Sequence, residues 1–387
     1  MATSTESWGG RVPLMIAHCA GMVDLVALPV WVGALIERYG FDEPHAGGLA
    51  TLFLVGAVIS SLFFARLFNR LNGRVAATIG YALSAIAFAA ATQTASWGGL
   101  AALHFVAGAS AGCALSFTHG AIAHASNPHR LFAIVGLALG VFAILFLGAT
   151  PNLINAFGGP ALFAVFAVVM AVAAIASAIA FPTITARSAA GEDIVEEVAH
   201  LKPAVWFGIA GISCMALTQA MMFSFLQHIG VDRGFGAEAV TGVLIALGFV
   251  NLIPAPLAAY LETRVSPRLV LAIGPILQAL IVIAITTSSS FFGYAIPALF
   301  FAAVMIFTHT FAFGVLARLD PTARALAGTP AMLMVGAAIG PILGGVLVSS
   351  FGYGSLAVAA VAINAFALLL FTRLHAPARP LAAAPAR

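Results

Sequence analysis

The chain has 387 residues, of which 62% are hydrophobic and only 7% are charged, and its mean hydropathy is +1.09. A soluble globular domain carries roughly a quarter of charged residues, so this composition excludes a chain that is solvated mainly by water. The formal net charge is only +3, and the charges lie in short loops between apolar runs, which excludes a nucleic-acid-binding surface.

Twelve apolar runs make up most of the chain, separated by short segments rich in proline, glycine and charged residues. Each run is close to the roughly 20 residues that a helix needs to cross a bilayer. Barrel strands would show short alternation instead, so the sequence predicts an all-α membrane protein with twelve transmembrane helices. The predicted spans are 12–36, 47–67, 75–92, 98–123, 131–150, 161–181, 205–226, 240–261, 269–287, 294–317, 325–348 and 355–371.

The basic residues test this number of spans. If the N-terminus lies in the cytoplasm, fourteen of the 16 Lys and Arg residues fall on the cytoplasmic side, and only Arg38 and Arg233 fall on the other. Cytoplasmic loops carry an excess of Lys and Arg, so the pattern predicts both termini in the cytoplasm, with the chain in an inner membrane of bacterial type. The cytoplasmic set comprises Arg11, Arg66, Arg70, Arg74, Arg130, Arg187, Lys202, Arg264, Arg268, Arg318, Arg324, Arg373, Arg379 and Arg387.

The longest polar segment, 183–203, divides the chain into a six-helix bundle at 1–182 and a second six-helix bundle at 204–387. It contains four acidic residues among scattered apolar ones, which suits either an amphipathic helix on the membrane surface or a solvated cytoplasmic linker. We favour the linker.

The two predicted bundles repeat each other at an offset of 194 residues. This offset superimposes Arg70 on Arg264, Arg74 on Arg268, and Gly40 on Gly234. The same offset superimposes Gly48 on Gly242, Ile79-Gly80 on Ile273-Gly274, and Arg130 on Arg324. A single offset that links both loops and helices is typical of transporters built from repeated halves, so we expect two pseudo-symmetric bundles.

The loop after the second span carries a family motif. The segment 65–74 and its echo at 261–268 resemble the loop of the major facilitator superfamily, where Gly is followed by Asp-Arg and Gly-Arg. Here Ala65 replaces the Gly and Asn69 replaces the Asp, with one extra residue, so the usual Asp-to-Arg contact of a gating state is missing. The resemblance implies gating roles for the arginines that remain, which are Arg70, Arg74, Arg264 and Arg268.

Two further segments are similar to this superfamily: 104–112 in the fourth span, where many members carry Arg at the position of His104, and the glycine-rich 336–345 in the eleventh. Small residues at every fourth position let helix backbones approach closely. The Gly-Pro motif of drug/proton antiporters is replaced in the fifth span by loosely spaced Gly140, Gly148 and Pro151, which weakens that assignment. The resemblance implies that spans 1, 4, 7 and 10 line a central cavity and that the halves rock in alternating access.

Asp24 is the one Asp, Glu, Lys or Arg predicted well inside a span. A carboxylate at that depth is costly and usually faces a protein interior or a water path, so we expect Asp24 to carry a coupled proton. The alternative is a carboxyl held by helix hydroxyls or amides for structural reasons. His104 is the second candidate for proton coupling, because some sugar/proton symporters pair an acid in span 1 with a base in span 4. The predicted depths differ by about two turns, which leaves direct contact open.

Other polar or soft side chains in the predicted cavity spans are candidates for binding the substrate. For each histidine, the alternative is a core residue bonded to a backbone carbonyl. Residues four apart share a helix face, and imidazole with thioether suits copper, so His18 with Met22 and Met305 with His309 form an alternative metal site. The candidate substrate-binding residues are His18, Met22, His119, Thr218, Gln219, Asn251, Thr308 and His309.

These patterns favour a proton-coupled secondary transporter for a small organic solute, without a cofactor and without catalytic residues. The Gly-x-Ser-x-Gly match at 108–112 lies within a predicted membrane helix, so a hydrolase is excluded. Copper transport and drug/proton antiport are the alternatives, and a non-transporting receptor is a third. The three cysteines, Cys19, Cys113 and Cys214, lie in apolar runs, which indicates buried thiols without disulfides. The expected partners are solute, protons and lipid, with a monomeric chain.

Overall fold

The computed structural model describes residues 4–65, 67, 68, 70–126, 128–182, 203–262, 264–319 and 329–374. Across these ranges the chain forms helices and no strand. The first six spans contain α1 (Trp8–Gly21), α2 (Val23–Tyr39), α3 (Glu43–Ala65), α4 (Gly73–Ala91), α5 (Trp97–Ala123), α6 (Pro128–Phe157) and α7 (Pro160–Ala180). The last six contain α8 (Pro203–Asp232), α9 (Ala237–Val250), α10 (Pro254–Leu261), α11 (Pro267–Thr287), α12 (Phe291–Leu319), α14 (Thr329–Phe351) and α15 (Gly354–Thr372).

Twelve segments of the described chain are long and apolar enough to cross a membrane, which confirms the all-α fold with twelve spans. Each overlaps one predicted run. The helices extend beyond the apolar runs, to 30 residues in α6 and in α8, because polar residues continue them past the apolar stretch. The predicted cytoplasmic linker 183–203 lies outside the described residues, apart from Pro203, which begins α8.

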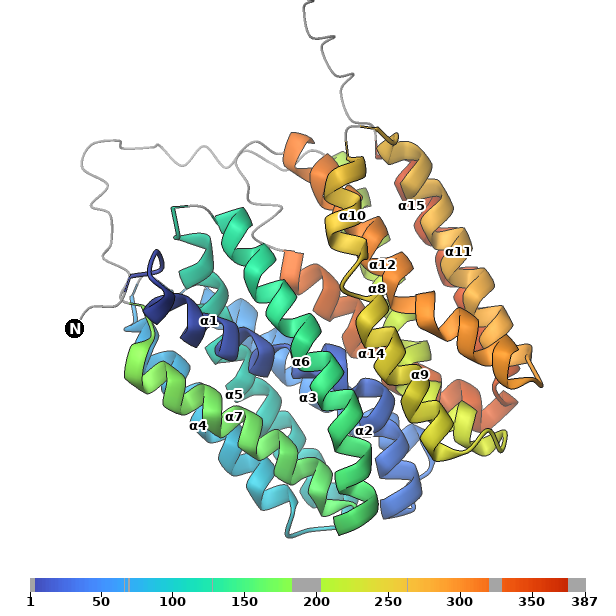
Figure 1. The fold of residues 1–387 in the computed structure, drawn as a ribbon, viewed down its shortest axis with the longest axis horizontal. Helices are drawn as coiled ribbons and strands as arrows, with labels where there is room; N and C mark the ends of the chain where they lie inside the picture. Colours follow the sequence, from blue (N-terminus) through green and yellow to red (C-terminus); the bar gives the residue numbers. More distant parts are fainter. Residues whose placement is uncertain are drawn as a thin grey trace, which may run out of the picture.

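Two spans are interrupted helices. Span 8 breaks at residues 251–253, between α9 and α10, directly before Pro254 and close to Pro256, because proline lacks an N–H and restricts the residue before it. The predicted span 12–36 is confirmed as one membrane span over Trp8–Tyr39, but it is not one continuous helix. It breaks at Met22, whose φ of −109° and ψ of 21° separate α1 from α2. Figure 1 shows α1 running obliquely into the bundle while α2 continues to its far end.

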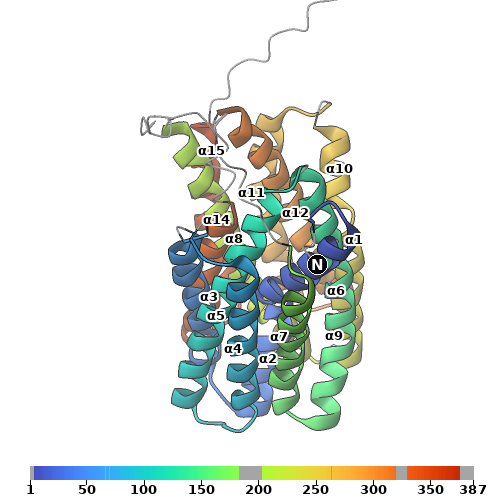
Figure 2. The same ribbon diagram turned by 90° about the vertical axis from the view of Figure 1, so that its left-hand side faces the viewer.

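The ends of the bundle differ in charge. We call the end where Arg70, Arg74, Arg264 and Arg268 lie the basic end, and the end where Arg38 and Arg233 lie the opposite end. Figure 2 shows the spans running along a common direction between these ends. At the opposite end, Gly40 (φ +70°) and Gly234 (φ +75°) both follow the first span of their half in left-handed conformation. These two glycines are related by the predicted offset of 194 residues, so the repeat extends to the backbone.

The first six spans (blue to green) and the last six (yellow to red) occupy different sides of Figure 1 and pack together mainly through α3 with α14, α2 with α8, and α6 with α9. Glycines let α3 and α14 touch backbone to backbone. A Cβ at Gly47 would meet the backbone of Pro341, and one at Gly345 would meet the backbone of Glu43, each nearer than 3.0 Å. The Ile342 amide also donates to the Thr51 hydroxyl (3.2 Å). The halves are therefore in tight contact toward the opposite end.

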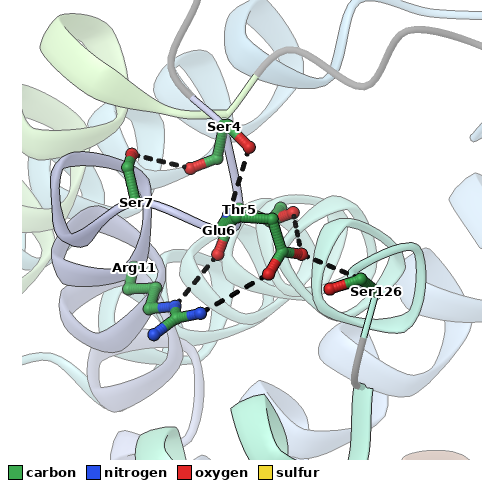
Figure 3. A network of polar contacts seen from close by, with 6 residues as sticks. All are labelled: Ser4, Thr5, Glu6, Ser7, Arg11 and Ser126. Carbon is green, nitrogen blue, oxygen red and sulfur yellow. Dashed lines mark hydrogen bonds and ion pairs between the residues drawn. The ribbon is translucent and has the colours of Figure 1, made fainter.

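The N-terminal segment is tied to the loop between α5 and α6 at the basic end. Figure 3 shows the Glu6 carboxylate accepting from the Ser126 amide (2.9 Å), with the Arg11 guanidinium 3.5 Å from its other oxygen. Arg11 also donates through Nε to the Thr5 carbonyl (3.1 Å). The hydrogen bond that the Ser126 amide donates is the main cause that lowers the pKa of Glu6 below its ordinary range. The nearby Arg11 charge adds a smaller effect in the same direction.

Glu6→Gln is expected to loosen this contact at neutral pH and to have no effect in acid. A group whose folded-state pKa is lowered contributes stability above its ordinary pKa, and this contribution is lost as the pH falls through the lowered value. Hydrogen exchange of the Ser126 amide at pH 7 and at acid pH checks this. Equal protection of Ser126 in both variants at pH 7 would show that the carboxylate does not hold the segment.

Candidate functional site

Asp24 lies two residues after the break in span 1, in the first turn of α2, and its side chain is fully buried. Neither carboxylate oxygen has a hydrogen-bond partner among the described residues. The amides of Asp24 and Leu25, at the start of α2, are the nearby polar groups. The N-terminus of a helix carries partial positive charge, so the break places this carboxyl where a negative charge is best tolerated without an ion-pair partner.

The direction in which the Asp24 side chain points follows from its position on α2. Leu28 and Trp31 lie four and seven residues after it, on the same face of α2. The Trp31 ring packs against Phe88 of α4 and Phe166 of α7, with ring centroids 6.2 and 4.7 Å away. Asp24 therefore points into the interior of the first six spans.

Tyr81 of α4 stabilises the break from the side. Its hydroxyl donates to the Ala17 carbonyl of α1 (2.6 Å) and lies 3.3 Å from the Thr118 hydroxyl of α5. A Cβ on Gly21 would meet this hydroxyl at 2.9 Å, so glycine is needed for α1 to approach so closely. One phenol thus links the end of α1 to two neighbouring helices.

Tyr81→Phe is expected to destabilise the protein by about 1 kcal/mol, because it removes a buried hydrogen bond to a carbonyl and changes little else. The measurement is the free energy of unfolding in mixed micelles. Tyr260→Phe is the matched control, since Tyr260 is exposed on α10. A loss no larger than that of the control would show that the phenol does not brace the break.

The His104 side chain forms its hydrogen bonds with groups other than Asp24. Its Nε2 lies 3.3 Å from the indole Nε1 of Trp31, which donates to it, and its Nδ1 lies 2.7 Å from the Leu100 carbonyl. A neutral imidazole with its proton on Nδ1 satisfies both contacts. The contact between Asp24 and His104 that the sequence left open is therefore not made in this structure, because Trp31, seven residues after Asp24, fills the position.

His18 of α1 and His119 of α5 face each other directly. Nδ1 of His18 lies 3.0 Å from Nε2 of His119, and the ring centroids are 5.1 Å apart. One nitrogen must donate and the other accept, so the bond requires that at least one of the two be unprotonated at this position. Both were predicted as substrate-binding residues, and the structure brings them together beside the break.

Met22 fills the break with apolar contacts. It belongs to a buried cluster with Ala57 of α3, Leu115 of α5 and Met334 of α14, so the cluster joins both halves. Met305, in contrast, is buried in a separate cluster of the last six spans, with Met215 among its members. In the described part of the chain, no group of three or more His, Cys, Asp or Glu lies together as a metal site would require. The residues of the alternative copper site therefore lie in different buried clusters.

The last six spans hold their own buried polar pairs. The Asn364 amide of α15 donates to the Thr218 hydroxyl of α8 (3.1 Å), and its oxygen has no partner among the described residues. The Gln278 amide of α11 donates to the Met215 carbonyl (3.1 Å) and reaches Gln219 Oε1 at 3.4 Å. Thr218 and Gln219 were predicted from the sequence.

Three other predicted residues lie apart from these pairs. Asn251 ends α9 at the break in span 8, and its buried Oδ1 has no partner within the described ranges. Thr308 of α12 donates to the Val304 carbonyl (2.7 Å) and packs against Gly274. The His309 ring packs on Phe313, with centroids 4.9 Å apart.

The predicted gating arginines have different surroundings. Arg74 donates to the Ile179 carbonyl (2.9 Å), which ties α4 to the end of α7. Arg264 stacks on the Tyr260 ring at 3.9 Å, whereas Arg70 and Arg268 are exposed. Asn69, which replaces the motif Asp, lies outside the described residues.

Sequence reasoning missed several polar residues of the site. Tyr81, Gln278 and Asn364 are all buried in predicted spans, and a search for every hydrogen-bonding side chain within an apolar run would have found them. It also missed the pair formed by Glu37 of α2 and His228 of α8, 4.0 Å apart across the two halves.

The sequence model of the Major Facilitator Superfamily matches residues 14–329, which is more than half of the chain. The chain belongs to this superfamily. Members of the Major Facilitator Superfamily are transporters, so this chain is a secondary transporter of the multi-pass membrane type.

Solved Major Facilitator transporters share its fold. A bacterial homologue of the human lysosomal transporter Spinster, in an inward-facing and occupied conformation, superposes with a TM-score of 0.70 at 15% identity, covering 94% of this chain and 93% of that chain. The nucleoside transporter NupG superposes with a TM-score of 0.68 at 14% identity, covering 95% and 97%. No curated protein matches in sequence. At these identities the likeness shows the fold alone.

Proposed function

We propose that this Major Facilitator member moves a small organic solute across the membrane by alternating access, driven by protons that bind Asp24. The observation that carries the proposal is the complete burial of an unpartnered carboxyl at the break of span 1. Burying an unpaired carboxylate is very costly, whereas a neutral acid is much cheaper to bury. A proton that binds while Asp24 faces water would thus be carried inside when the site closes.

The packing of the halves supports alternation between two states. Contact of α3 with α14 closes the opposite end, and the Met22 cluster joins both halves two residues before Asp24. Asp24 is therefore enclosed in this conformation and gains access to water when the halves move. We infer that the six-span halves, 1–182 and 204–387, move as units, that the basic end is cytoplasmic, and that the chain acts as a monomer in a bacterial-type inner membrane.

The solute is inferred to be neutral, cationic or weakly acidic. No Lys or Arg lies well inside a span to receive a strong anion, unless histidines such as His18 and His119 become protonated. Polar groups of the last six spans, including Thr218, Gln219 and Asn251, are proposed to contact the solute. His104, bonded to Trp31 and Leu100, is proposed to act on coupling only through its support of α2.

A ligand screen followed by uptake measurements tests this function. Ligands raise the apparent stability of the protein that binds them, so thermal shifts with metabolites, cationic drugs and metal ions identify the solute. Proteoliposomes with an imposed pH gradient should then accumulate it, and a protonophore should abolish the accumulation. Full activity in metal-free buffer would count against copper transport, whereas accumulation that is indifferent to the protonophore would overturn proton coupling.

A further inference from the structure

An apolar groove lies on the outer surface of the last six spans, away from the site at Asp24. Its volume is about 360 Å³, and its walls are formed by α10, α11 and α12, of which α12 packs against both others. Thr308 is its one polar side chain, and the Thr308 hydroxyl already donates to the Val304 carbonyl. The groove therefore offers a ligand apolar contacts alone.

The groove opens toward the bilayer. Ile253, Leu257, Leu269 and Ile273 line it, and between 41% and 59% of each is exposed. All four belong to segments that are apolar and long enough to span a membrane. From Leu269 to Leu277 the groove follows nine residues of α11, whose eight steps rise about 12 Å at roughly 1.5 Å each. Its shape and surroundings suit an extended hydrocarbon chain.

Positive charge gathers where the groove reaches the basic end. Val265 and Leu269 line the groove there, and they directly follow Arg264 and Arg268 in sequence. Arg264 is exposed and stacked on Tyr260, an aromatic residue of the kind that anchors at membrane interfaces. Arg268 is exposed, and none of the described residues pairs with it.

Two other features at this end influence the charge. Helix α11 begins at Pro267 without a side-chain cap, so the partial positive charge of its first turn adds to that of the arginines. Glu262 brings one negative charge, and its carboxylate lies toward α12, 3.5 Å from where a Cβ of Gly314 would stand. Because Arg264 and Arg268 bring two positive charges, the net charge of this loop is positive.

We propose that this groove binds one anionic phospholipid, with an acyl chain along α11 and the phosphate at Arg264 and Arg268. The apolar walls select a chain from the bilayer, and the arginines select an anionic headgroup over a zwitterionic one, as basic pockets between membrane helices do. The site is independent of the proposed solute path, because it lies on the lipid-facing surface.

Native mass spectrometry of the full-length protein, released from detergent with defined lipids, tests the proposal. The wild type should retain one dioleoyl phosphatidylglycerol on the order of tenfold more tightly than dioleoyl phosphatidylcholine. The double variant Arg264→Gln, Arg268→Gln should retain both lipids equally. The double variant Arg70→Gln, Arg74→Gln is the matched control, because these are the repeat-related residues of the first half, and it should retain the wild-type preference.

Two further measurements separate the groove from simple charge attraction. Ala303→Phe, which fills the groove from α12, should weaken retention of both lipids, and inorganic phosphate at the lipid concentration should not bind. Three results would overturn the proposal: equal retention of the two lipids by the wild type, unchanged preference in the Arg264→Gln, Arg268→Gln variant, or a mass of two chains without lipid, which would mean that a second copy covers the groove.

Discussion

Asp24→Asn is expected to abolish solute accumulation driven by a pH gradient. Asparagine has nearly the shape of the protonated carboxyl, so the packing at the start of α2 should be kept. The amide cannot release a proton, however, and solute movement is then no longer tied to the gradient. Uptake should end at equal solute concentrations on both sides of the membrane.

Exchange distinguishes loss of coupling from loss of function. Labelled solute inside proteoliposomes should still exchange with unlabelled solute outside through the Asp24→Asn variant, because exchange needs movement of the halves but no net proton transfer. Asp42→Asn is the matched control, since Asp42 is exposed in the loop before α3 and accepts from the His45 amide (2.9 Å). Undiminished accumulation by Asp24→Asn would remove Asp24 from the mechanism.

Gly345→Val is expected to disfavour closure of the opposite end and to lower transport by roughly fivefold or more. The new Cβ would press on the backbone of Glu43, which cannot rotate away as a side chain could. Overpacking of this kind costs about 1–3 kcal/mol, which shifts a two-state equilibrium by about 5- to 150-fold. The conformation open at this end avoids the clash, so its population should rise.

Distances between spin labels at Ala95 and Ser289, which are exposed in opposite-end loops of the two halves, report this shift. The labels need a background in which Cys19, Cys113 and Cys214 are replaced by alanine. Gly47→Val should lengthen the same distance, because its Cβ would meet the Pro341 backbone, whereas Gly48→Val should not, because the nearest atom there is 4.0 Å away on the Trp97 ring. Identical distance distributions in all variants would contradict the closed contact of α3 with α14.

Much of the fold could be predicted from the sequence because the lipid bilayer sets the length and the polarity of every segment that crosses it. An apolar run such as 98–123 must be a helix if it crosses a bilayer, and α5 spans Trp97–Ala123. The break at 251–253 has a cause that is visible in the sequence, since Pro254 and Pro256 act through their own backbone. The break at Met22 could not be predicted, because no residue there forbids a helix and the contacts of Gly21 with Tyr81 and Leu115 come from distant segments.

The residue types of the site could be predicted from the sequence, whereas their hydrogen-bond partners could be predicted less well. Asp24 is identified by its charge in an apolar run, and its burial follows from that position. The partner of His104 depends on where the Trp31 ring lies, 73 residues away in sequence, and a comparison of depths along two helices cannot fix it. His18 and His119 were predicted as substrate-binding residues of spans 1 and 4, and the direction of α1 decides that their rings meet.

The most direct test of the central claim is the proton count on solute binding. Purified wild-type protein in weakly buffered detergent solution, titrated with its solute between pH 5 and pH 9, should take up or release protons over part of that range. Asp24→Asn should bind the same solute with no proton change at any pH. The same proton change in both proteins, or none in the wild type across the range, would contradict coupling through Asp24.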